Sequence, residues 1–497
     1  MCLDGGNFKM KLKKILNNID FEVIRGDLKK DIVEIGYDSR DIKENNLFIA
    51  IKGFETDGHQ YIAQALENGA SAVIIENEIT EYQPEIAYIK VKNSRRAMAK
   101  MAKNFFDDPL NDINLVGITG TNGKTTTAYL LYNILKEYAG RAALFGTIKN
   151  IIGGKVVDSS RTTPESLDLY RYFARMKKSG IKYGVMEVSS HALDLYRVYG
   201  MDFAAAIFTN ISPEHLNYHK SFENYREVKS RLFSNLSNQQ YAVINVDDPN
   251  AEYIQNKSNG KNFSYSLNSK TADLYTSEYQ LNQRGMKYKS EGRVSSIFEL
   301  NLGGIFNIYN SLAAILTADL LGIAKEISKK ALLKIKSVPG RFEIINAGQN
   351  FQVVVDYAHT PDGMKNVLKT AAAMEKNRLI VLFGCGGDRD RSKRAEMAKL
   401  AEKYADYTIV SNDNPRSEDP EIIFSEIENG FSQDFSDYEI ISDRKKAIEK
   451  AIMMAEKDDL VMLLGRGHEK YQVIKDKKIE LDDRKVAYKA AEKTKGI

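Results

Sequence analysis

The sequence predicts an α/β protein built from three domains. At 497 residues the chain is long enough for about three domains of ordinary size. Short apolar runs rich in Val, Ile, Ala and Phe alternate with helical patterns over most of its length. This alternation is typical of sheets that are mostly parallel and buried on both faces. We predict the domains at residues 1–92, 93–338 and 339–497.

The first predicted domain is small and mixed in structure. It contains the strand-like runs FIAIKG, SAVIIE and IAYIKV and one helical segment, His59 to Asn68. These elements are enough for a compact α/β domain but too few for an ATP-binding core.

The second predicted domain follows a helical segment at Ser94 to Phe106. Its strand candidates are LVGIT, AALFGT, YGVMEVSS, AAAIFTNI and YAVINVDD, which predict a mostly parallel buried sheet. The more polar stretch Thr271 to Val294 predicts an antiparallel edge. A helix at Asn307 to Leu321 closes the domain, and SVPGRFE at Ser337 to Glu343 is the predicted hinge.

The third predicted domain is doubly wound and Rossmann-like. Four apolar runs, QVVVD, LIVLFG, TIVS and LVMLLG, are each followed by polar or glycine-rich residues and a helix. Ligands of such sheets bind at the carboxyl ends of the strands. Each of the four ends carries a polar cluster, at residues 356–359, 384–389, 413–416 and 465–469. Ordinary loop composition explains any one cluster, whereas four on one predicted rim favour a binding site.

A glycine loop indicates that the second domain binds a nucleotide triphosphate. Its residues are Gly120, Thr121, Asn122, Gly123, Lys124, Thr125 and Thr126. The glycines let the backbone surround phosphates, Lys124 would neutralise their charge, and a hydroxyl of Thr125 or Thr126 would reach Mg²⁺. Ile118 replaces the first glycine of the strict P-loop pattern, so a chance glycine turn remains the alternative.

Composition limits the partners and the compartment. The net charge of +4 is small, and both signs are interspersed, which argues against a nucleic-acid surface and favours small-molecule partners. Two cysteines, Cys2 and Cys385, exclude a disulfide framework and a cysteine metal site. The start of the chain has no signal-peptide pattern, and no apolar stretch approaches a bilayer span. We expect a cytoplasmic monomer without membrane insertion.

Carboxylates and imidazoles follow two strands of the second domain. Glu187 follows YGVMEV, while Glu214, His215, Asn217 and His219 follow AAAIFTN. Their oxygen and nitrogen atoms suit a second Mg²⁺ site near the phosphate loop, and hydrogen-bonded loop residues are the simpler alternative. Shortly afterwards a lysine occurs in the helical run NYREVKSRLF, where spacing alone predicts a solvated side chain.

These motifs resemble those of the Mur ligases of peptidoglycan synthesis, which are ATP-dependent amide-bond synthetases of three domains. GTNGKTT, MEVSSHAL, TNISPEHLNYH, EVKSRLF, GIFNIYNSLAA and VPGRFE occur in the order of that family along nearly the whole chain. Within the family, YDSRDI, DGHQYIAQAL and DNPR resemble the third-step ligases. Those enzymes extend UDP-N-acetylmuramoyl-L-alanyl-D-glutamate, and the resemblance implies that the first domain binds the uridine nucleotide.

The resemblance also implies cofactors and the residues that hold them. ATP would be bound by the phosphate loop and by Asn310, Arg341 and Asp356. Two Mg²⁺ ions are implied, with ligands at Thr125, Glu187, His215 and Lys229. Lys229, the lysine of EVKSRLF, would carry a CO₂-derived carbamate, which turns a cation into an anion. The family usually has Asp at the positions of Glu214 and Asn217, and these two departures leave the finer metal geometry open but not the fold.

The substrate contacts that the resemblance implies fall into two groups. Those to the muramoyl dipeptide are Ser39, His59, Thr162, Thr163, Ser190 and Arg197. Those to the incoming amino acid are Arg389, Asp413, Asn414, Pro415, Arg416, Gly465 and Glu469.

The implied reaction transfers a phosphoryl group from ATP to the D-glutamate γ-carboxylate, and an amine then attacks the acyl phosphate. The implied catalytic residues are Lys124, Glu187, His215, Lys229 and His359. The proton acceptor is either His359 or a carboxylate near it. Because a guanidinium fork matches a carboxylate, DNPR favours meso-diaminopimelate over L-lysine.

Several alternatives remain at this point. A thioether diamino diacid would satisfy the same contacts as meso-diaminopimelate. A lysine-adding ligase of the same step and a folylpolyglutamate synthetase-like ligase are rival enzymes. A nucleotide-binding switch without ligation is a rival of another class.

Overall fold

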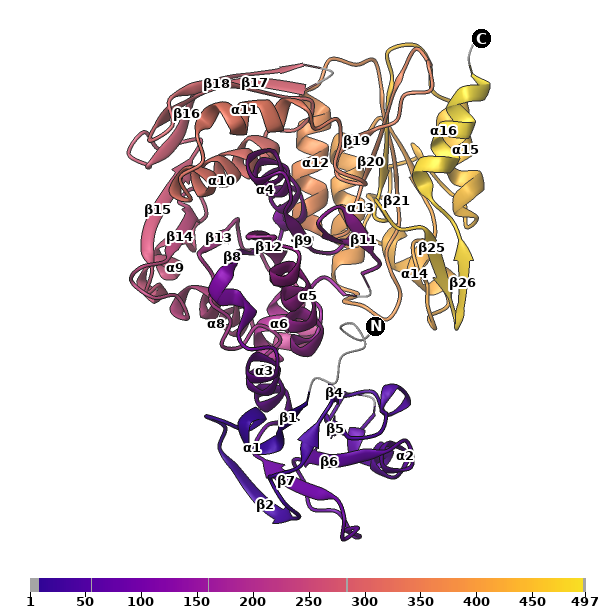
Figure 1. Cartoon of the computed structure of the whole chain (residues 1–497). Helices are drawn as coiled ribbons and strands as arrows, with labels where there is room; N and C mark the ends of the chain where they lie inside the picture. Colours follow the sequence, from indigo (N-terminus) through magenta and orange to yellow (C-terminus); the bar gives the residue numbers. More distant parts are fainter. Residues whose placement is uncertain (1–8, 55, 160, 283–284, 495–497) are drawn as a thin grey trace. The chain divides into compact units, whose positions relative to one another are not determined.

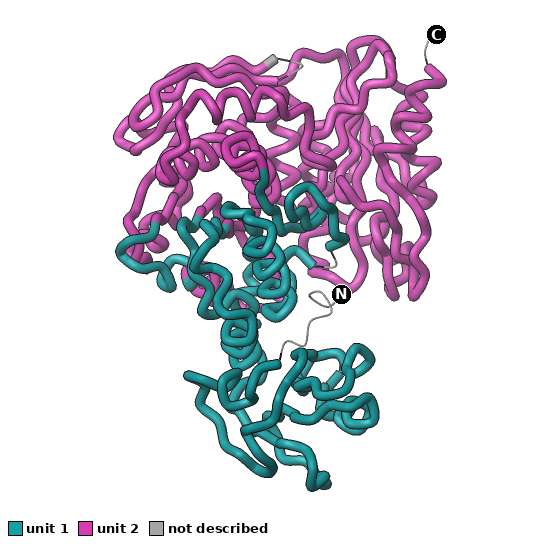
Figure 2. The backbone as a smooth tube through the Cα atoms, viewed as in Figure 1, with its two compact units in different colours: residues 1–117, 141–206, 231–240 teal, residues 118–140, 207–230, 241–497 magenta. Residues whose placement is uncertain are grey.

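The computed structural model describes residues 9–54, 56–159, 161–282 and 285–494 (Figure 1). Cys2 therefore lies outside the described residues. Contacts divide the chain into two compact units (Figure 2). Unit 1 comprises residues 1–117, 141–206 and 231–240, and unit 2 comprises residues 118–140, 207–230 and 241–497. Two strands, β8 (Asn114–Thr119) and β13 (Ala205–Phe208), and the helix α8 (Phe222–Ser234) run from one unit into the other.

The first part of unit 1 is a five-stranded sheet in the order β2-β7-β6-β5-β4. Its strands are β2 (Phe21–Arg25), β4 (Glu34–Gly36), β5 (Asn46–Ile49), β6 (Ala70–Ile75) and β7 (Ala87–Val91). All neighbours are parallel except β2, which pairs antiparallel with β7. The predicted helix at His59 to Asn68 is a 3₁₀ turn, η2 (Gly58–Tyr61), followed by α2 (Ile62–Glu67).

Short elements complete this first part. They are β1 (Met10–Lys11), α1 (Leu12–Ile15), β3 (Asp31–Ile32) and η1 (Ser39–Asp41). The strands β1 and β3 form their own antiparallel pair. Apolar side chains of α2 and the sheet form the local core, including Ile62, Phe48, Val73 and Tyr88.

The remainder of unit 1 contains helices and a second group of strands. These are α3 (Ser94–Phe105), η3 (Pro109–Asp112), β9 (Ala143–Phe145), β10 (Asn150–Ile152), β11 (Lys155–Val157), α5 (Ser166–Lys178), β12 (Tyr183–Glu187) and α6 (Ser190–Asp194). The strands β9 and β12 are parallel, and β10 and β11 extend the sheet as an antiparallel hairpin. The sequence patterns did not predict that hairpin, because each of its strands has only three residues.

Unit 2 begins with the helix that follows the glycine loop. Its first elements are α4 (Lys124–Ala139), α7 (Leu216–His219), β14 (Tyr241–Asn245), α9 (Ala251–Lys257), β15 (Lys261–Ser266), β16 (Leu274–Asn282), β17 (Gly285–Gly292), β18 (Ser296–Leu300), α10 (Phe306–Leu320) and α11 (Lys325–Leu333). The strands β14, β15 and β16 are parallel, whereas β16, β17 and β18 are antiparallel. The antiparallel edge predicted between Thr271 and Val294 is therefore confirmed.

The last part of unit 2 is a six-stranded sheet in the order β19-β20-β24-β21-β22-β23. Its strands are β19 (Glu343–Ile344), β20 (Gln352–Asp356), β21 (Leu379–Phe383), β22 (Tyr407–Val410), β23 (Tyr438–Ile440) and β24 (Leu460–Leu464). Only β19 runs antiparallel. Its helices are α12 (Pro361–Ala373), α13 (Lys393–Tyr404), α14 (Pro420–Glu428), α15 (Arg444–Met453) and α16 (Asp483–Lys493), and the hairpin β25 (Tyr471–Ile474) and β26 (Lys477–Glu480) precedes α16.

Alternating strand residues divide the apolar core of this sheet between its two faces. Val354, Val381 and Met462 pack with residues of α12, α13 and α14. The next residues in sequence, such as Val355 and Leu463, pack with α15 and α16. Figure 1 shows α12 and α13 on one side of these strands and α15 and α16 on the other. Because both faces are covered, the strands are apolar throughout, and the predicted doubly wound fold is confirmed.

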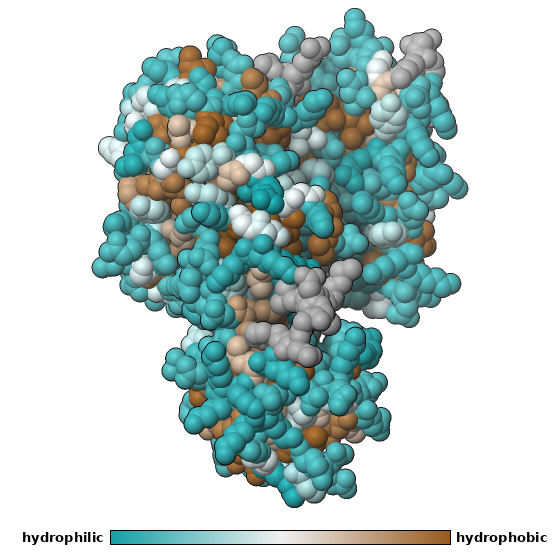
Figure 3. All heavy atoms as spheres, in the orientation of Figure 1, coloured by the Kyte–Doolittle hydropathy of each residue, from teal (hydrophilic) through white to brown (hydrophobic). Residues whose placement is uncertain are grey.

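The surface drawn in Figure 3 is covered mostly by hydrophilic residues. Among the described helices, none has both the length and the apolar character that crossing a bilayer requires.

A buried charge pair fastens α16 to the sheet. Arg444 and Asp483 are almost fully buried, and Nη2 of Arg444 donates to Oδ2 of Asp483 at 2.7 Å and to the carbonyl of Leu464 at 2.8 Å. Nε of Arg466, which is also buried, lies 3.5 Å from Oδ1 of Asp483. One carboxylate therefore compensates two guanidinium groups.

We predict that Asp483→Asn lowers the free energy of unfolding by about 3 to 5 kcal/mol, because it leaves two buried cations without their shared anion. Urea unfolding of the variant and the wild type measures the difference. Asp434→Asn changes an exposed carboxylate in the same way and serves as the control. Equal unfolding curves for the two variants would contradict the prediction.

Candidate functional site

The glycine loop connects β8 to the N-terminus of α4, as the sequence predicts. Gly123 precedes the helix with a φ of 85°, and a Cβ atom there would lie 2.5 Å from Oδ1 of Asn310. Only glycine fits this position. Asn310 itself is held by a hydrogen bond from Oγ1 of Thr127 at 3.2 Å. The backbone N–H groups at the start of α4 form an anion-binding geometry.

Two lysines meet at one carbonyl of this loop. Nζ of Lys124 donates to the carbonyl oxygens of Gly120 at 2.7 Å and Thr121 at 2.9 Å. Nζ of Lys229 donates to the same Gly120 oxygen at 2.8 Å and lies 4.6 Å from the ring centroid of Tyr225. The side chain of Lys229 is buried rather than solvated, contrary to what spacing alone predicts.

The environment of Lys229 favours the neutral amine. Burial is the main cause that lowers the pKa of Lys229 well below its usual value, and the positive charge of Lys124 lowers it further. A neutral amine has a free electron pair and is a nucleophile, whereas an ammonium group is not.

Glu214 lies between two histidines. Its Oε1 atom is 3.7 Å from Nε2 of His215 and 3.7 Å from Nε2 of His359. Burial lowers the pKa of His215 to about 4, so its imidazole is neutral near pH 7. Burial also lowers the pKa of His359, whose Nδ1 atom is 2.9 Å from the carbonyl of Tyr357. His359 therefore donates from Nδ1 and keeps Nε2 as an acceptor.

Asp362, at the start of α12, is bound to the phosphate loop. Its Oδ2 atom accepts hydrogen bonds from Nδ2 of Asn122 at 2.8 Å and from Oγ of Ser212 at 3.2 Å. Thr360 caps α12 by accepting from the N–H of Gly363 at 3.2 Å. Sequence patterns did not single out Asp362, although it closely follows the strand-end cluster at residues 356–359.

The predicted hinge is held by Asp356. Its two carboxylate oxygens accept from the N–H groups of Phe342 at 2.6 Å and Ala358 at 2.7 Å. Phe342 has a φ of 46°, so these bonds stabilise a backbone conformation that is unfavourable for phenylalanine. Burial raises the pKa of Asp356. Next to it, Nη2 of Arg341 donates to Oγ1 of Thr125 at 3.1 Å, and its guanidinium lies 4.3 Å from the ring centroid of Tyr357.

Gly340 of the hinge contacts the loop after β24. It has a φ of 64°, and a Cβ atom there would lie 2.1 Å from the backbone nitrogen of His468. The close approach of the two backbones requires glycine. The hinge is thus fixed to the loop that contains Gly465 and Glu469.

Glu187 ends β12 and belongs to unit 1, whereas Thr125, His215 and Lys229 belong to unit 2. Glu187 is fully buried. Its Oε1 atom accepts from the N–H of Thr147 at 2.9 Å, and Oε2 accepts from the hydroxyl of Thr147 at 3.0 Å. No sequence motif had indicated Thr147.

The predicted muramoyl-peptide contacts of unit 1 lie close to Glu187. Oγ1 of Thr162 lies 3.1 Å from Oγ1 of Thr147, which can accept its hydrogen bond, and Oγ1 of Thr163 donates to the carbonyl of Glu187 at 2.8 Å. Nη1 of Arg197 donates to the carbonyl of Thr163 at 3.1 Å. Ser190 begins α6 and is buried.

Ser39 and His59 lie in the first part of unit 1. Oγ of Ser39 donates to Oε1 of Gln64 at 2.7 Å. The imidazole of His59 is engaged at both nitrogens, with Nδ1 2.6 Å from Oδ1 of Asp57 and Nε2 accepting from the N–H of Glu76 at 3.0 Å. Its ring therefore stabilises the local fold.

The predicted amino-acid contacts converge in the last part of unit 2. Nη1 of Arg416 donates to the carbonyl of Gly387 at 2.6 Å, next to Arg389. Nδ2 of Asn414 donates to Oε2 of Glu469 at 2.8 Å. The clusters at residues 384–389, 413–416 and 465–469 therefore meet at the carboxyl ends of β21, β22 and β24.

The hairpin of β25 and β26 fixes the backbone of Arg416. The N–H of Arg416 donates to the carbonyl of Val473 at 3.1 Å, and the N–H of Lys475 donates to the carbonyl of Arg416 at 2.6 Å. Arg416 has a φ of 52°, so this restraint acts on a strained residue. Sequence patterns predicted neither the hairpin nor its contact with Arg416.

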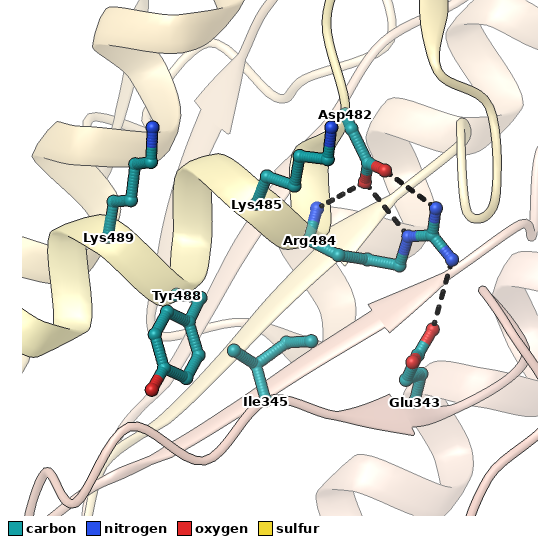
Figure 4. A pocket seen from close by; sticks show the side chains of 7 residues that line it. All are labelled: Glu343, Ile345, Asp482, Arg484, Lys485, Tyr488 and Lys489. Atoms are coloured by element: carbon teal, nitrogen blue, oxygen red, sulfur yellow. Dashed lines mark hydrogen bonds and ion pairs between the residues drawn. The ribbon is translucent and has the colours of Figure 1, made fainter.

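A surface pocket of about 350 Å³ lies elsewhere in unit 2 (Figure 4). It is lined by Glu343, Ile345, Asp482, Arg484, Lys485, Tyr488 and Lys489. The guanidinium of Arg484 is already paired with Asp482 at 2.7 Å. None of the predicted site residues lines this pocket.

Donor residues for a metal do not form a ready-made cluster within one unit. Within the described ranges, no group of three or more His, Cys, Asp or Glu side chains is arranged to hold an ion.

His468 makes stability depend on pH. Burial, followed by the charges of Arg341 and Arg484, lowers the pKa of His468 from 6.5 to about 3. As the pH falls below 6.5, the unfolded chain therefore binds a proton that the folded protein does not bind, and the free energy of unfolding decreases.

We predict that His468→Gln makes this pH dependence shallower by up to about 1.4 kcal/mol per pH unit between about pH 4 and pH 6. Denaturant unfolding of both proteins across this range measures the slope. Equal slopes would show that His468 does not control the titration.

Comparison with known proteins places the chain in a family. Family models described as the Mur ligase family catalytic domain, the Mur ligase middle domain and the Mur ligase glutamate ligase domain match residues 31–106, 118–318 and 340–467. Two UDP-N-acetylmuramoyl-L-alanyl-D-glutamate--2,6-diaminopimelate ligases are similar over 96% of this chain and 98% of their own length. That of Clostridium tetani is 43% identical, and that of Caldanaerobacter subterraneus subsp. tengcongensis is 44% identical.

A solved structure agrees with the sequence matches. It is the structure of a UDP-N-acetylmuramoyl-L-alanyl-D-glutamate--2,6-diaminopimelate ligase, and it superposes with a TM-score of 0.69 at 31% identity. The match covers 98% of this chain and 99% of the other. The chain therefore belongs to the Mur ligase family.

Proposed function

We propose that this protein joins meso-diaminopimelate to the γ-carboxylate of D-glutamate in UDP-N-acetylmuramoyl-L-alanyl-D-glutamate, at the expense of ATP, in the cytoplasm. The names of the similar ligases support the substrate pair. The observation that carries the proposal is the convergence of Arg416, Asn414 and Glu469 at one rim of the last sheet. A guanidinium and a carboxylate there suit a substrate with both a carboxylate and an ammonium group at its distal end.

The phosphate loop is the proposed ATP site. Its backbone N–H groups would bind phosphate oxygens, and Lys124 would leave its carbonyl partners to neutralise the terminal phosphate. We propose that the adenosine side of the site is formed by Arg341, Asn310 and Asp356. Arg341 stacks on Tyr357, and Asn310 lies against the phosphate loop. Both carboxylate oxygens of Asp356 already accept hydrogen bonds from backbone amides. We therefore propose that Asp356 shapes the adenosine site by holding its backbone in place.

The donors that the family resemblance implies are of kinds that Mg²⁺ accepts. The hydroxyl of Thr125 and the carboxylate of Glu187 are oxygen donors, and the neutral imidazole of His215 offers a lone pair. Bound Mg²⁺ would neutralise charge that develops on the transferred phosphoryl group. Two ions are expected from the family.

Lys229 is proposed to become a carbamate. Its neutral amine would attack CO₂, a nitrogen–carbon bond would form, and the nitrogen would release its proton to solvent. The product is an anion beside Lys124, so a neutral neighbour of that lysine would become an attractive partner for its charge. The new carboxylate would complete the oxygen donors.

The protein's residues would act in two steps. Lys124 and the loop amides would position the γ-phosphoryl group against the glutamate carboxylate, and an acyl phosphate would form. The substrate amine would then attack, and Nε2 of His359 would accept its proton. Glu214, 3.7 Å from that nitrogen, would stabilise the resulting imidazolium. Phosphate then leaves.

Specificity would rest on the distal end of the amino acid. Arg416 and Arg389 are proposed to bind its carboxylate, while Glu469, with Asp413 nearby, would bind its ammonium group. Pro415 and Gly465 would shape the pocket. L-lysine lacks the carboxylate and would leave Arg416 unpaired, which disfavours it. A thioether diamino diacid would fit equally well.

The remaining assignments follow the same proposal. The muramoyl dipeptide would lie against Thr162, Thr163, Ser190 and Arg197, and the uridine nucleotide against the segment that contains Ser39 and His59. We propose functional domains at residues 1–92, 93–338 and 339–497, and a monomer as the active form.

We predict phosphate release with ATP, Mg²⁺, the UDP-dipeptide and meso-diaminopimelate, and none when L-lysine replaces the diacid. Arg416→Ala is expected to reduce kcat/KM for meso-diaminopimelate by about 30-fold or more, because a charge-paired contact costs at least about 2 kcal/mol. Arg141→Ala, which removes an exposed arginine, is the matched control.

The outcomes separate the alternatives. Turnover with L-lysine alone would contradict the specificity but keep the ligase. Phosphate release only with a folate and glutamate would favour the folylpolyglutamate alternative, and ATP binding without release under any condition would favour a nucleotide switch.

We further predict that Lys229 carries a carbamate. The wild type incubated with ¹³C-labelled bicarbonate is expected to show a carbamate carbon signal in its NMR spectrum that Lys229→Gln lacks. Lys220→Gln, on a nearby exposed lysine, should retain the signal. An identical signal in the Lys229 variant would exclude this modification site.

A further inference from the structure

Arg466 is a fully buried arginine that contacts residues of the proposed amino-acid site. Its guanidinium reaches in several directions. Nη1 donates to Oδ1 of Asn414 at 3.0 Å, Nη2 donates to the carbonyl of Leu481 at 3.1 Å, and Nε lies 3.5 Å from Oδ1 of Asp483. Nη1 is also 3.5 Å from Oε2 of Glu469.

The contacts of Asn414 fix the orientation of its amide. Oδ1 accepts two hydrogen bonds, from Arg466 and from the N–H of Val473 at 2.8 Å. Two donors on one side require the oxygen there, so Nδ2 must point the other way. On that side Nδ2 donates to Oε2 of Glu469 at 2.8 Å. Asn414 therefore transmits the position of Arg466 to the carboxylate of Glu469.

Arg466 is itself anchored. Asp483, which lies beside its Nε, is held by Arg444 through Nε at 3.1 Å and Nη2 at 2.7 Å. Arg444 also donates to the carbonyl of Leu464, the last residue of β24. The guanidinium of Arg466 is consequently tied to the sheet and to α16, and it is not free to follow Asn414.

We propose that Arg466 is a positioning residue that orients Asn414 and, through it, Glu469, and so sets the affinity for the ammonium end of the amino-acid substrate. The inference rests on the proposed function. Arg466 also lies 3.5 Å from one oxygen of each of two carboxylates, Asp483 at its Nε and Glu469 at its Nη1.

The geometry requires arginine at this position. Oxygen atoms of four different residues surround one planar group, and a lysine ammonium on a single stem cannot face all of them in the same arrangement. Arg466→Lys therefore keeps the charge while it removes the fixed orientation. Arg466→Gln removes the charge as well and provides a second test.

The experiment measures steady-state phosphate release for the wild type, Arg466→Lys, Arg466→Gln, Asn414→Ala and the double variant Arg466→Lys/Asn414→Ala. We expect Arg466→Lys to raise the KM for meso-diaminopimelate about tenfold and to leave the KM values for ATP and the UDP-dipeptide within about twofold. In the background of Asn414→Ala the same change is expected to have little further effect, because Arg466 acts through Asn414.

The control is Arg141→Lys, the same substitution at an exposed position. Similar increases of all three KM values, or effects of Arg466→Lys and Asn414→Ala that simply multiply, would overturn the inference. If Arg466→Lys does not fold, Arg466→Gln is judged by the same criteria, and failure of both to fold would assign Arg466 to stability and overturn the inference. Absence of wild-type turnover with meso-diaminopimelate would instead refute the proposed function, and this inference with it.

Discussion

The carboxylate of Asp356 is the junction on which the arrangement of unit 2 depends. It ends β20 and binds the backbone of both Phe342 and Ala358, so the hinge and the segment that carries His359 share one buried anchor. From this junction Arg341 reaches the phosphate loop at Thr125, and Gly340 packs on the loop of His468. A displacement of the hinge would therefore move both the phosphate loop and the loop that contains His468.

Buried cations are treated in two different ways in this molecule. The buried guanidinium groups of Arg444 and Arg466 share Asp483 and bind backbone carbonyls, which compensates their loss of hydration. Lys229 has a carbonyl, an aromatic ring and another lysine as neighbours, and its burial favours the neutral form. The first pattern gives rigidity, and the second gives a reactive nitrogen. A guanidinium group stays charged, which suits the buried ion pairs. A buried lysine amine loses its proton readily, which suits the reactive position of Lys229.

Local patterns in the sequence were sufficient for the fold class and for most strands. The apolar runs after Gln352 predicted the parallel strands of the last sheet, because strands covered on both faces need no polar positions. The strands β10 and β11 were not predicted, because a segment of three residues shows no periodicity. Predicted domain boundaries remain predictions.

The site was predictable where a motif is continuous and not where it is assembled from distant segments. The glycine loop can be identified from its own consecutive residues. Asp362, in contrast, binds Asn122, which lies 240 residues away in sequence. The proposed role of Arg466 depends on its contact with Asn414, 52 residues earlier. Within a recognised strand-end cluster, local sequence does not distinguish the polar side chain that faces the ligand from the one that supports its neighbour.

The hairpin β25–β26 holds the backbone of Arg416 on both its N–H and its carbonyl, although the hairpin itself is largely exposed. The backbone of the proposed specificity residue is therefore held in place by an exposed element. An inhibitor that bound this hairpin and changed its conformation would displace Arg416 without entering the proposed nucleotide site. Such a compound would not have to compete with cellular ATP, and resistance to it would arise in hairpin residues, away from the phosphate loop.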